Sequence, residues 1–250
     1  MKKKSINKNV YYVLGILFII VLWEIVSLFL DDNNLIFPSF FDVIKNLLLI
    51  LKTSYLYKCL LSTFVRMLIG LFFAGIFSLL IGSISGNNDS FRYFISPIIT
   101  CFKSIPTASL VFLFLVYVGA KNTPIYIVFL ISFPIIYESV TDSYLNIDNN
   151  INDVLDLEKG SFFKKIISIR LPLAINGFKL GLLSSFSLAF KIEIMAEVIS
   201  GSTTYGLGSA INYIQKADPT NMVGVLAYSL VAIVLSLFID FLYKLLVKNS

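Results

Sequence analysis

Residues 150–172 read NINDVLDLEKGSFFKKIISIRLP and form the longest mixed polar stretch between strongly apolar ones. The spacing of Ile151 and Leu155 predicts a short amphipathic helix in the first half of this stretch. Gly160 favours a helix end, because glycine readily takes the left-handed conformation found there. A second helix is predicted after it and closes at Leu171-Pro172, because proline lacks the N–H that the helix ladder needs.

The second predicted helix carries two adjacent phenylalanines, Phe162 and Phe163, with Ile166 and Ile169 at helical spacing. Two interpretations remain open: a plain surface loop, and a helix–glycine–helix element that docks into the groove of a partner. Two exposed phenylalanines in series need a place to be buried, which favours docking. Each large apolar side chain buried in this way contributes about 1.5–3 kcal/mol before the costs of association.

The composition excludes several classes of protein. Apolar residues make up 57% of the chain and charged residues only 14%, and the mean hydropathy is +0.86. A soluble domain carries nearer a quarter charged residues, so we expect a polytopic membrane protein. The chain has no histidine, which excludes Ser-His-Asp and Cys-His nucleophilic sites and histidine-ligated metal sites. We expect no cofactor and no metal.

The apolar segments predict an all-α fold with about six transmembrane helices, each near the length that a bilayer core requires. The expected spans are residues 10–30, 60–84, 93–118, 124–140, 173–199 and 222–247, with a polar connection at 202–218. Residues 35–58 form an external amphipathic segment whose apolar face comprises Val43, Ile44, Leu47, Leu48 and Leu51. Pro97 and Pro106 predict a kink or break in the third span. We expect one transmembrane domain over 1–250, in which 1–58 hold the first span and the external segment and 60–247 hold the core helices.

Basic residues indicate the orientation of this domain. Six crossings place both termini on one side, and the inside-positive rule makes that side the cytoplasm. The external pieces would then hold only Lys45, Lys52, Lys58, Lys121 and Lys216. The cytoplasmic pieces would hold Lys2, Lys3, Lys4, Lys8, Arg92, Lys159, Lys164, Lys165, Arg170, Lys244 and Lys248. We therefore expect a multi-pass protein of the cell membrane with cytoplasmic termini and a cytoplasmic 150–172 loop.

The 150–172 loop resembles the EAA loop of ABC-importer permeases, whose pattern is EAA, three residues, Gly, nine residues, Ile, one residue, Leu-Pro. Ile169, Leu171 and Pro172 match the end of that pattern. Asp153 stands at the acidic position, with Val154 and Leu155 in place of the two alanines. Lys159 stands at the glycine position and Gly160 one residue later. The coupling-loop residues are thus Asp153, Val154, Leu155, Lys159, Gly160, Phe162, Phe163, Ile166, Ile169, Leu171 and Pro172.

The resemblance extends along most of the chain to the nitrate/sulfonate/taurine group of permeases, which includes importers of thiamine precursors. It rests on the segments 37–39, 62–66, 102–106, 196–197 with 206–208, and on Asp240. It implies an ABC-importer permease that moves a small solute inward by alternating access. The implied partners are cytoplasmic ATPase subunits, an extracytoplasmic solute-binding protein, a second permease copy and membrane lipid. The segment 201–206 has GxxxxG spacing, but Leu207 and Gly208 follow it instead of Lys and Ser/Thr, so it is no P-loop.

Polar residues inside the spans are candidates for the translocation path. Arg66 is expected more as an ion-pair or carbonyl partner than as a solute ligand, and Lys103 beside the proline break is similar. Glu193 and Glu197 share a helix face, where like charges repel. We favour their solvation at the external interface over a gating role. Gly177 and Gly181 favour helix packing, whereas the serines that follow favour a path lining. The path candidates are Arg66, Lys103, Pro106, Ser184, Ser185, Glu193 and Glu197.

Two other classes of function stay open from the residues. A polytopic membrane enzyme would need carboxylate or Ser/Lys chemistry, for which no convergent pair is evident. A secondary transporter would show ion-driven uptake and inverted repeats, which the sequence does not display. The ABC permease interpretation predicts a transport subunit without its own ATPase site.

Overall fold

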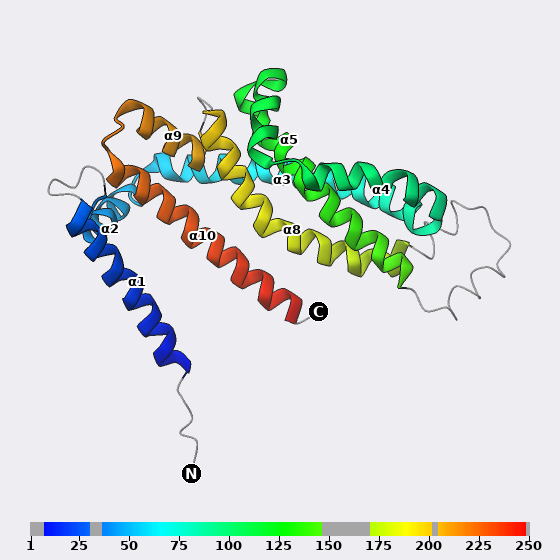
Figure 1. The fold of residues 1–250 in the computed structure, drawn as a ribbon, viewed down its shortest axis with the longest axis horizontal. Coiled ribbons are helices and arrows are strands. Elements are labelled where there is room, and N and C mark those ends of the chain that lie inside the picture. The colour runs from blue at the N-terminus through cyan, green and yellow to red at the C-terminus, as the bar shows by residue number, and fades with distance from the viewer. Residues whose placement is uncertain (1–7, 31–36, 147–170, 202–204, 249–250) are drawn as a thin grey trace, which may run out of the picture.

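The computed structural model describes residues 8–30, 37–146, 171–201 and 205–248. The helices in these residues are α1 (Lys8–Leu30), α2 (Phe40–Ile50), α3 (Ser54–Asn87), α4 (Asp89–Ser104), α5 (Thr107–Leu145), α8 (Leu171–Ser200), α9 (Leu207–Ala217) and α10 (Met222–Lys248). All secondary structure within the described part is helical, which confirms the all-α prediction (Figure 1).

Among the described residues, four helices are long and apolar enough to cross a membrane: α1, α3, α5 and α10. α8 is also long, with 30 residues, but it carries Lys179, Lys191, Glu193 and Glu197. The fold is thus that of a polytopic membrane protein. The six crossings stay a prediction, which requires α8 to cross and α5 to cross in two segments.

α5 is two helical segments that meet at Gly119. Gly119 has φ 76 and ψ 163, a backbone conformation that side-chain-bearing residues rarely adopt. The Thr123 hydroxyl donates to the Gly119 carbonyl at 2.9 Å and accompanies the change of direction. The two segments correspond to the end of the predicted third span and to the predicted fourth span.

The predicted proline break lies between α4 and α5. Pro106 precedes the first residue of α5, and its carbonyl accepts from the N–H groups of Ser109 and Leu110. Pro97 lies inside α4 and does not end it. Only Pro106 therefore interrupts the helix, because it lies directly before the first turn of a new helix, where proline is tolerated.

α3 and α5 run parallel and in close contact. A methyl group at Gly70 would lie 2.8 Å from Val128 Cγ1, and one at Gly82 would lie 2.9 Å from Val140 Cγ1. The contacts advance in the same direction along both helices, and the Ser78 hydroxyl between them donates to the Phe133 carbonyl at 2.9 Å. Small residues on α3 thus allow α5 to approach its backbone.

α8 runs antiparallel to α5. Gly181 lies against Ser139, whose Cβ would be 2.8 Å from an added methyl group, and Gly177 lies against Ser139 and Ser143 one turn further along α5. The Ser139 hydroxyl donates to the Gly177 carbonyl at 2.6 Å. The glycine pair therefore serves packing within the chain, as the sequence favoured.

Of the two amino-terminal helices, α2 packs against α10, whereas α1 lies apart from the bundle (Figure 1). α1 extends away from the other helices, and almost none of its apolar stretch Val13–Leu30 is buried. The Trp23 indole N–H donates to the Pro38 carbonyl at 3.0 Å, and its ring contacts Phe37 and Phe40 at the start of α2. Ser39 caps α2 by accepting from the Asp42 N–H. The predicted amphipathic segment is thus a shorter helix that packs against α10.

Two boundaries differ from the sequence interpretation. α3 begins at Ser54, within the predicted external segment, because its first turn packs Leu56 and Cys59 into the core. The polar connection at 202–218 contains α9, whose first turn buries Leu207, Ala210 and Ile211. The coupling-loop residues up to Ile169 lie outside the described residues. Leu171 and Pro172 are the first described residues of α8.

Candidate functional site

The guanidinium of Arg66 on α3 lies inside the bundle and reaches across to α8. Its Nε donates to Glu193 Oε1 at 3.3 Å, and its Nη2 pairs with Glu197 Oε1. The same Nη2 donates to the Tyr205 carbonyl at 2.6 Å. Arg66 is 7% exposed and both glutamates are 0% exposed. Arg66 is therefore both an ion-pair and a carbonyl partner, in agreement with the expectation from sequence.

Glu197 is the most extensively bonded member of this cluster. The Thr63 hydroxyl lies 3.0 Å from each of its carboxylate oxygens, and the Gly208 N–H donates to Oε2 at 2.8 Å. The Thr63 oxygen in turn accepts from the Leu207 N–H at 2.9 Å. The first turn of α9 thus directs two backbone N–H groups at the cluster, where a helix N-terminus favours negative charge.

Glycine at position 206 makes this approach possible. A methyl group there would lie 2.5 Å from Glu197 Oε1 and 2.6 Å from Arg66 Nη2. Any side chain would displace the ion pair. The 206–208 segment therefore closes over the cluster with its backbone, and Arg66, Glu193, Glu197 and Thr63 join α3, α8 and α9 into one unit.

The expected solvation of Glu193 and Glu197 is wrong. Both side chains are fully buried, because Arg66 lies between the carboxylates and the 206–208 segment covers them. The repulsion expected for like charges on one helix face is offset by the shared guanidinium. Glu193 Oε2 has no hydrogen-bond partner among the described residues.

The remaining path candidates lie elsewhere in the bundle. Lys103 on α4 pairs with Glu138 on α5, with its Nζ 2.8 and 2.9 Å from the two carboxylate oxygens, and both side chains are about half exposed. Pro106 is exposed at the break between these helices. Ser184 donates to the Gly181 carbonyl and Ser185, which is buried, donates to the Leu182 carbonyl, each at 3.0 Å. The structure therefore brings together three of the seven path candidates and leaves four outside the cluster.

Asp240 on α10 organises a second polar group with α8. The Ser187 hydroxyl and the Lys191 ammonium both donate to its carboxylate, the latter at 3.1 Å. Ser184 lines a hollow of about 250 Å³ next to these residues. Lys191 thus links α8 to α10 through Asp240.

Several members of these clusters were missed from sequence. Thr63 stands three positions before Arg66 and so shares its helix face. This spacing could have predicted from the sequence that the two side chains lie close together. Glu138 is an acidic residue within a predicted span, which by itself marks a candidate. The Tyr205 carbonyl carries no sequence signal, because every residue has one. Among the described residues, no group of three His, Cys, Asp or Glu side chains could hold a metal ion.

The described residues form a helical membrane bundle whose α3 and α8 are joined by buried ion pairs. Residues 78–249 match the family of binding-protein-dependent transport system inner membrane components, and the chain belongs to that family. It is the permease component of an ABC importer and not an enzyme, because in such importers the ATPase is a separate subunit.

Known proteins resemble the chain over most of its length. It is 20% identical to the putative aliphatic sulfonates transport permease protein SsuC of Bacillus subtilis (strain 168), with 99% of this chain and 91% of the relative covered. The fold is similar to that of the MetNI methionine ABC transporter in an inward-facing conformation, with a TM-score of 0.64, 18% identity, and 78% and 95% of the two chains covered. An amino acid ABC transporter matches with a TM-score of 0.59 and 16% identity over 78% and 94% of the two chains.

Proposed function

We propose that the chain moves a small solute inward by alternating access, driven by two cytoplasmic ATPase subunits that hold the 153–172 loop. The observation that carries the proposal is that the last two residues of the loop pattern belong to α8. The loop pattern ends at Leu171-Pro172, the first two described residues of α8. Movement of the loop would then be transmitted along this helix.

α8 connects the proposed coupling loop with the buried ion cluster. From residue 171 to residue 193 an α-helix rises about 33 Å, which is about the thickness of a bilayer core. The cluster fixes this far end of α8 to α3 and α9 through Arg66 and Glu197. Closure of the ATPase pair would then tilt α8, α3 and α9 together, as a population shift between inward- and outward-open states requires.

We propose a sulfonate-like anion as the first solute to test, because the SsuC relative is described as an aliphatic sulfonates permease. Nitrate, taurine and thiamine-precursor-like solutes are the other proposed substrates and would be tested next. An external binding protein delivers the solute, and two copies of the chain enclose the path. Both termini face the cytoplasm in this arrangement, in accordance with the distribution of lysines.

Uptake by the reconstituted complex tests the proposal. The chain is assembled with its ATPase and binding protein in vesicles, and ATP-dependent entry of an alkanesulfonate is measured. Gly160→Pro, or Asp153→Ala combined with Phe162→Ala, should abolish uptake and prevent co-purification of the ATPase. The matched control is Asp89→Ala with Phe94→Ala, which removes the same side-chain types from exposed positions of α4. Normal uptake by the loop variants would refute the proposal.

A further inference from the structure

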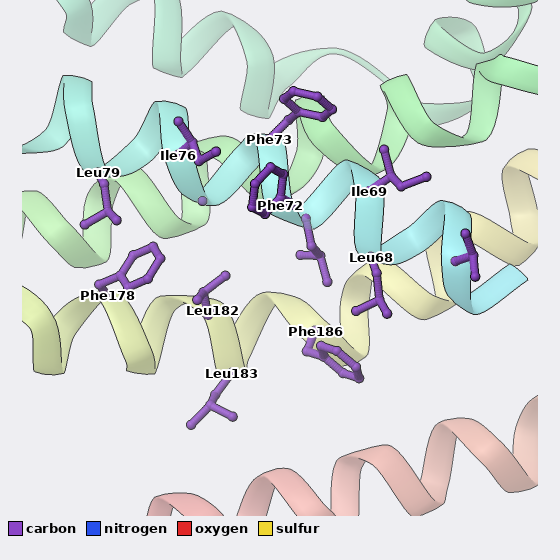
Figure 2. Close-up of a pocket in the computed structure, with 13 residues that line it drawn as sticks. Leu68, Ile69, Phe72, Phe73, Ile76, Leu79, Phe178, Leu182, Leu183 and Phe186 are labelled. Atoms are coloured by element: carbon purple, nitrogen blue, oxygen red, sulfur yellow. The ribbon is translucent and has the colours of Figure 1, made fainter.

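Two hollows along α3 share Val65 and Ile69 in their linings, so they adjoin there and are together named the groove. The larger hollow has a volume of about 870 Å³ and is lined only by apolar residues of α3 and α8. Figure 2 shows Phe178 and Leu182 of α8 lying across from Leu79 and Phe72 of α3. This part of the groove offers no polar side chain to a ligand.

The smaller hollow, of about 480 Å³, forms a polar end to the groove. Lys58 of α3 and Lys121 of α5 line it together with Ser62 and Asn122, and no carboxylate does. Both lysines are exposed, and neither forms an ion pair with any acidic side chain that the structure describes. Lys58 Nζ also lies 5.6 Å from the centre of the Tyr205 ring. This end of the groove thus presents two unneutralised ammonium groups.

Tyrosines mark the level of this polar end relative to a bilayer. Tyr205 lines this end, and the ring of Tyr55 lies 5.7 Å from the Tyr205 ring; both side chains are exposed. Tyrosine is enriched at the membrane–water interface, where the ring lies among headgroups and the hydroxyl meets water. The two lysines therefore lie at headgroup level, and the apolar part of the groove extends from there into the hydrocarbon.

We propose that this groove binds an anionic glycerophospholipid, with the headgroup phosphate between Lys58 and Lys121 and one acyl chain along α3. The apolar lining runs from Val65 to Leu79, which is about 21 Å along a helix and more than the ~15 Å of one hydrocarbon leaflet. A small solute anion would occupy only the polar end. A net negative lipid fits better than a zwitterionic one, because no carboxylate lines the site to receive a choline ammonium.

The site does not depend on the transported solute, and its occupancy would stabilise the contact of α3 with α5 and α8. The measurement is native mass spectrometry of the purified full chain, equilibrated with equal amounts of phosphatidylglycerol and phosphatidylcholine. The wild-type chain should retain phosphatidylglycerol preferentially. Lys58→Gln with Lys121→Gln should weaken this binding roughly thirtyfold, from about 1 kcal/mol for each lysine. The control, Lys45→Gln with Lys52→Gln, removes two exposed lysines outside the groove and should change binding by less than about twofold.

A second variant tests the apolar part separately. Ile76→Trp fills the apolar part of the groove without altering charge and should reduce retention of both lipids, while the thermal midpoint measured without added lipid is unchanged. Equal retention of the two lipids by the wild-type chain would overturn the proposal. So would an equal loss of phosphatidylglycerol binding in the two double lysine variants. Displacement of phosphatidylglycerol by butanesulfonate would assign the site to a free anion instead. Full disulfide cross-linking of Phe72→Cys between two copies, with no lipid retained, would assign the groove to the second copy.

Discussion

Arg66 of α3 and Glu197 of α8 stand 131 positions apart in the chain and form an ion pair inside the bundle. The glutamate also accepts the Gly208 N–H at the start of α9, and the arginine also donates to the Tyr205 carbonyl. Three segments of the chain, α3, α8 and residues 205–208, thus meet at one guanidinium–carboxylate contact. The following predictions test what this contact and its surroundings do.

Arg66→Met should lower the free energy of unfolding by about 3–5 kcal/mol, because it leaves two buried carboxylates without their cation. Arg66→Lys keeps the charge but loses the planar guanidinium that donates to both glutamates. Its free energy of unfolding should therefore lie between those of the wild type and Arg66→Met. Thermal unfolding of the purified chain in detergent gives the order. Lys52→Met, at an exposed position, is the control and should unfold like the wild type. An Arg66→Met chain as stable as this control would contradict the role of the cluster.

Gly206→Ala should destabilise the chain by about 1–3 kcal/mol, because the added methyl group would overlap Glu197 Oε1 and Arg66 Nη2. Gly15→Ala is the matched control, since nothing lies within 4 Å of its added methyl group and α1 gains a better helix former. The same unfolding experiment compares the two. If both alanines are neutral, the 206–208 segment does not close over the cluster.

Lys103→Gln should raise the KM of anion uptake without changing the thermal midpoint. The pair with Glu138 is about half exposed, and such pairs contribute only ~0–1 kcal/mol to stability, so a change in uptake would report a role in the path. Lys191→Gln removes a comparable half-exposed lysine that is paired with Asp240. Uptake kinetics in vesicles distinguish them. Equal changes in KM for both variants would contradict a role of Lys103 in the translocation path.

Single cysteines should report the orientation of the bundle. In a chain in which Cys59 and Cys101 are replaced by serine, we expect Lys121→Cys to react from outside with a membrane-impermeant maleimide, and Asp89→Cys to react only after the membrane is opened. Both positions are exposed, so burial does not limit labelling. The opposite pattern would place the 153–172 loop outside the cell and would refute its contact with an ATPase.

The sequence predicted the transmembrane class of the fold because hydropathy and length are local properties. Spans near residues 10–30, 60–84, 173–199 and 222–247 correspond to helices, since twenty apolar residues in series have few stable alternatives in a bilayer. α9 was missed because its buried stripe, Leu207 to Ile211, is short and lies in a polar stretch. The start of α3 was placed too late because its first turn is polar on the outside and buries only Leu56 and Cys59.

The sequence by itself determined that this protein is a helical membrane protein with ionisable residues within its spans, and it predicted that a loop resembling the EAA loop precedes α8. Only the tertiary structure decided that Arg66 lies between Glu193 and Glu197, that the backbone at 206–208 covers them, and that two lysines face an apolar groove. These outcomes depend on contacts between helices far apart in the chain. Whether a charged side chain within a span meets water, lipid or an opposite charge is set by its neighbours in space, which no local pattern specifies.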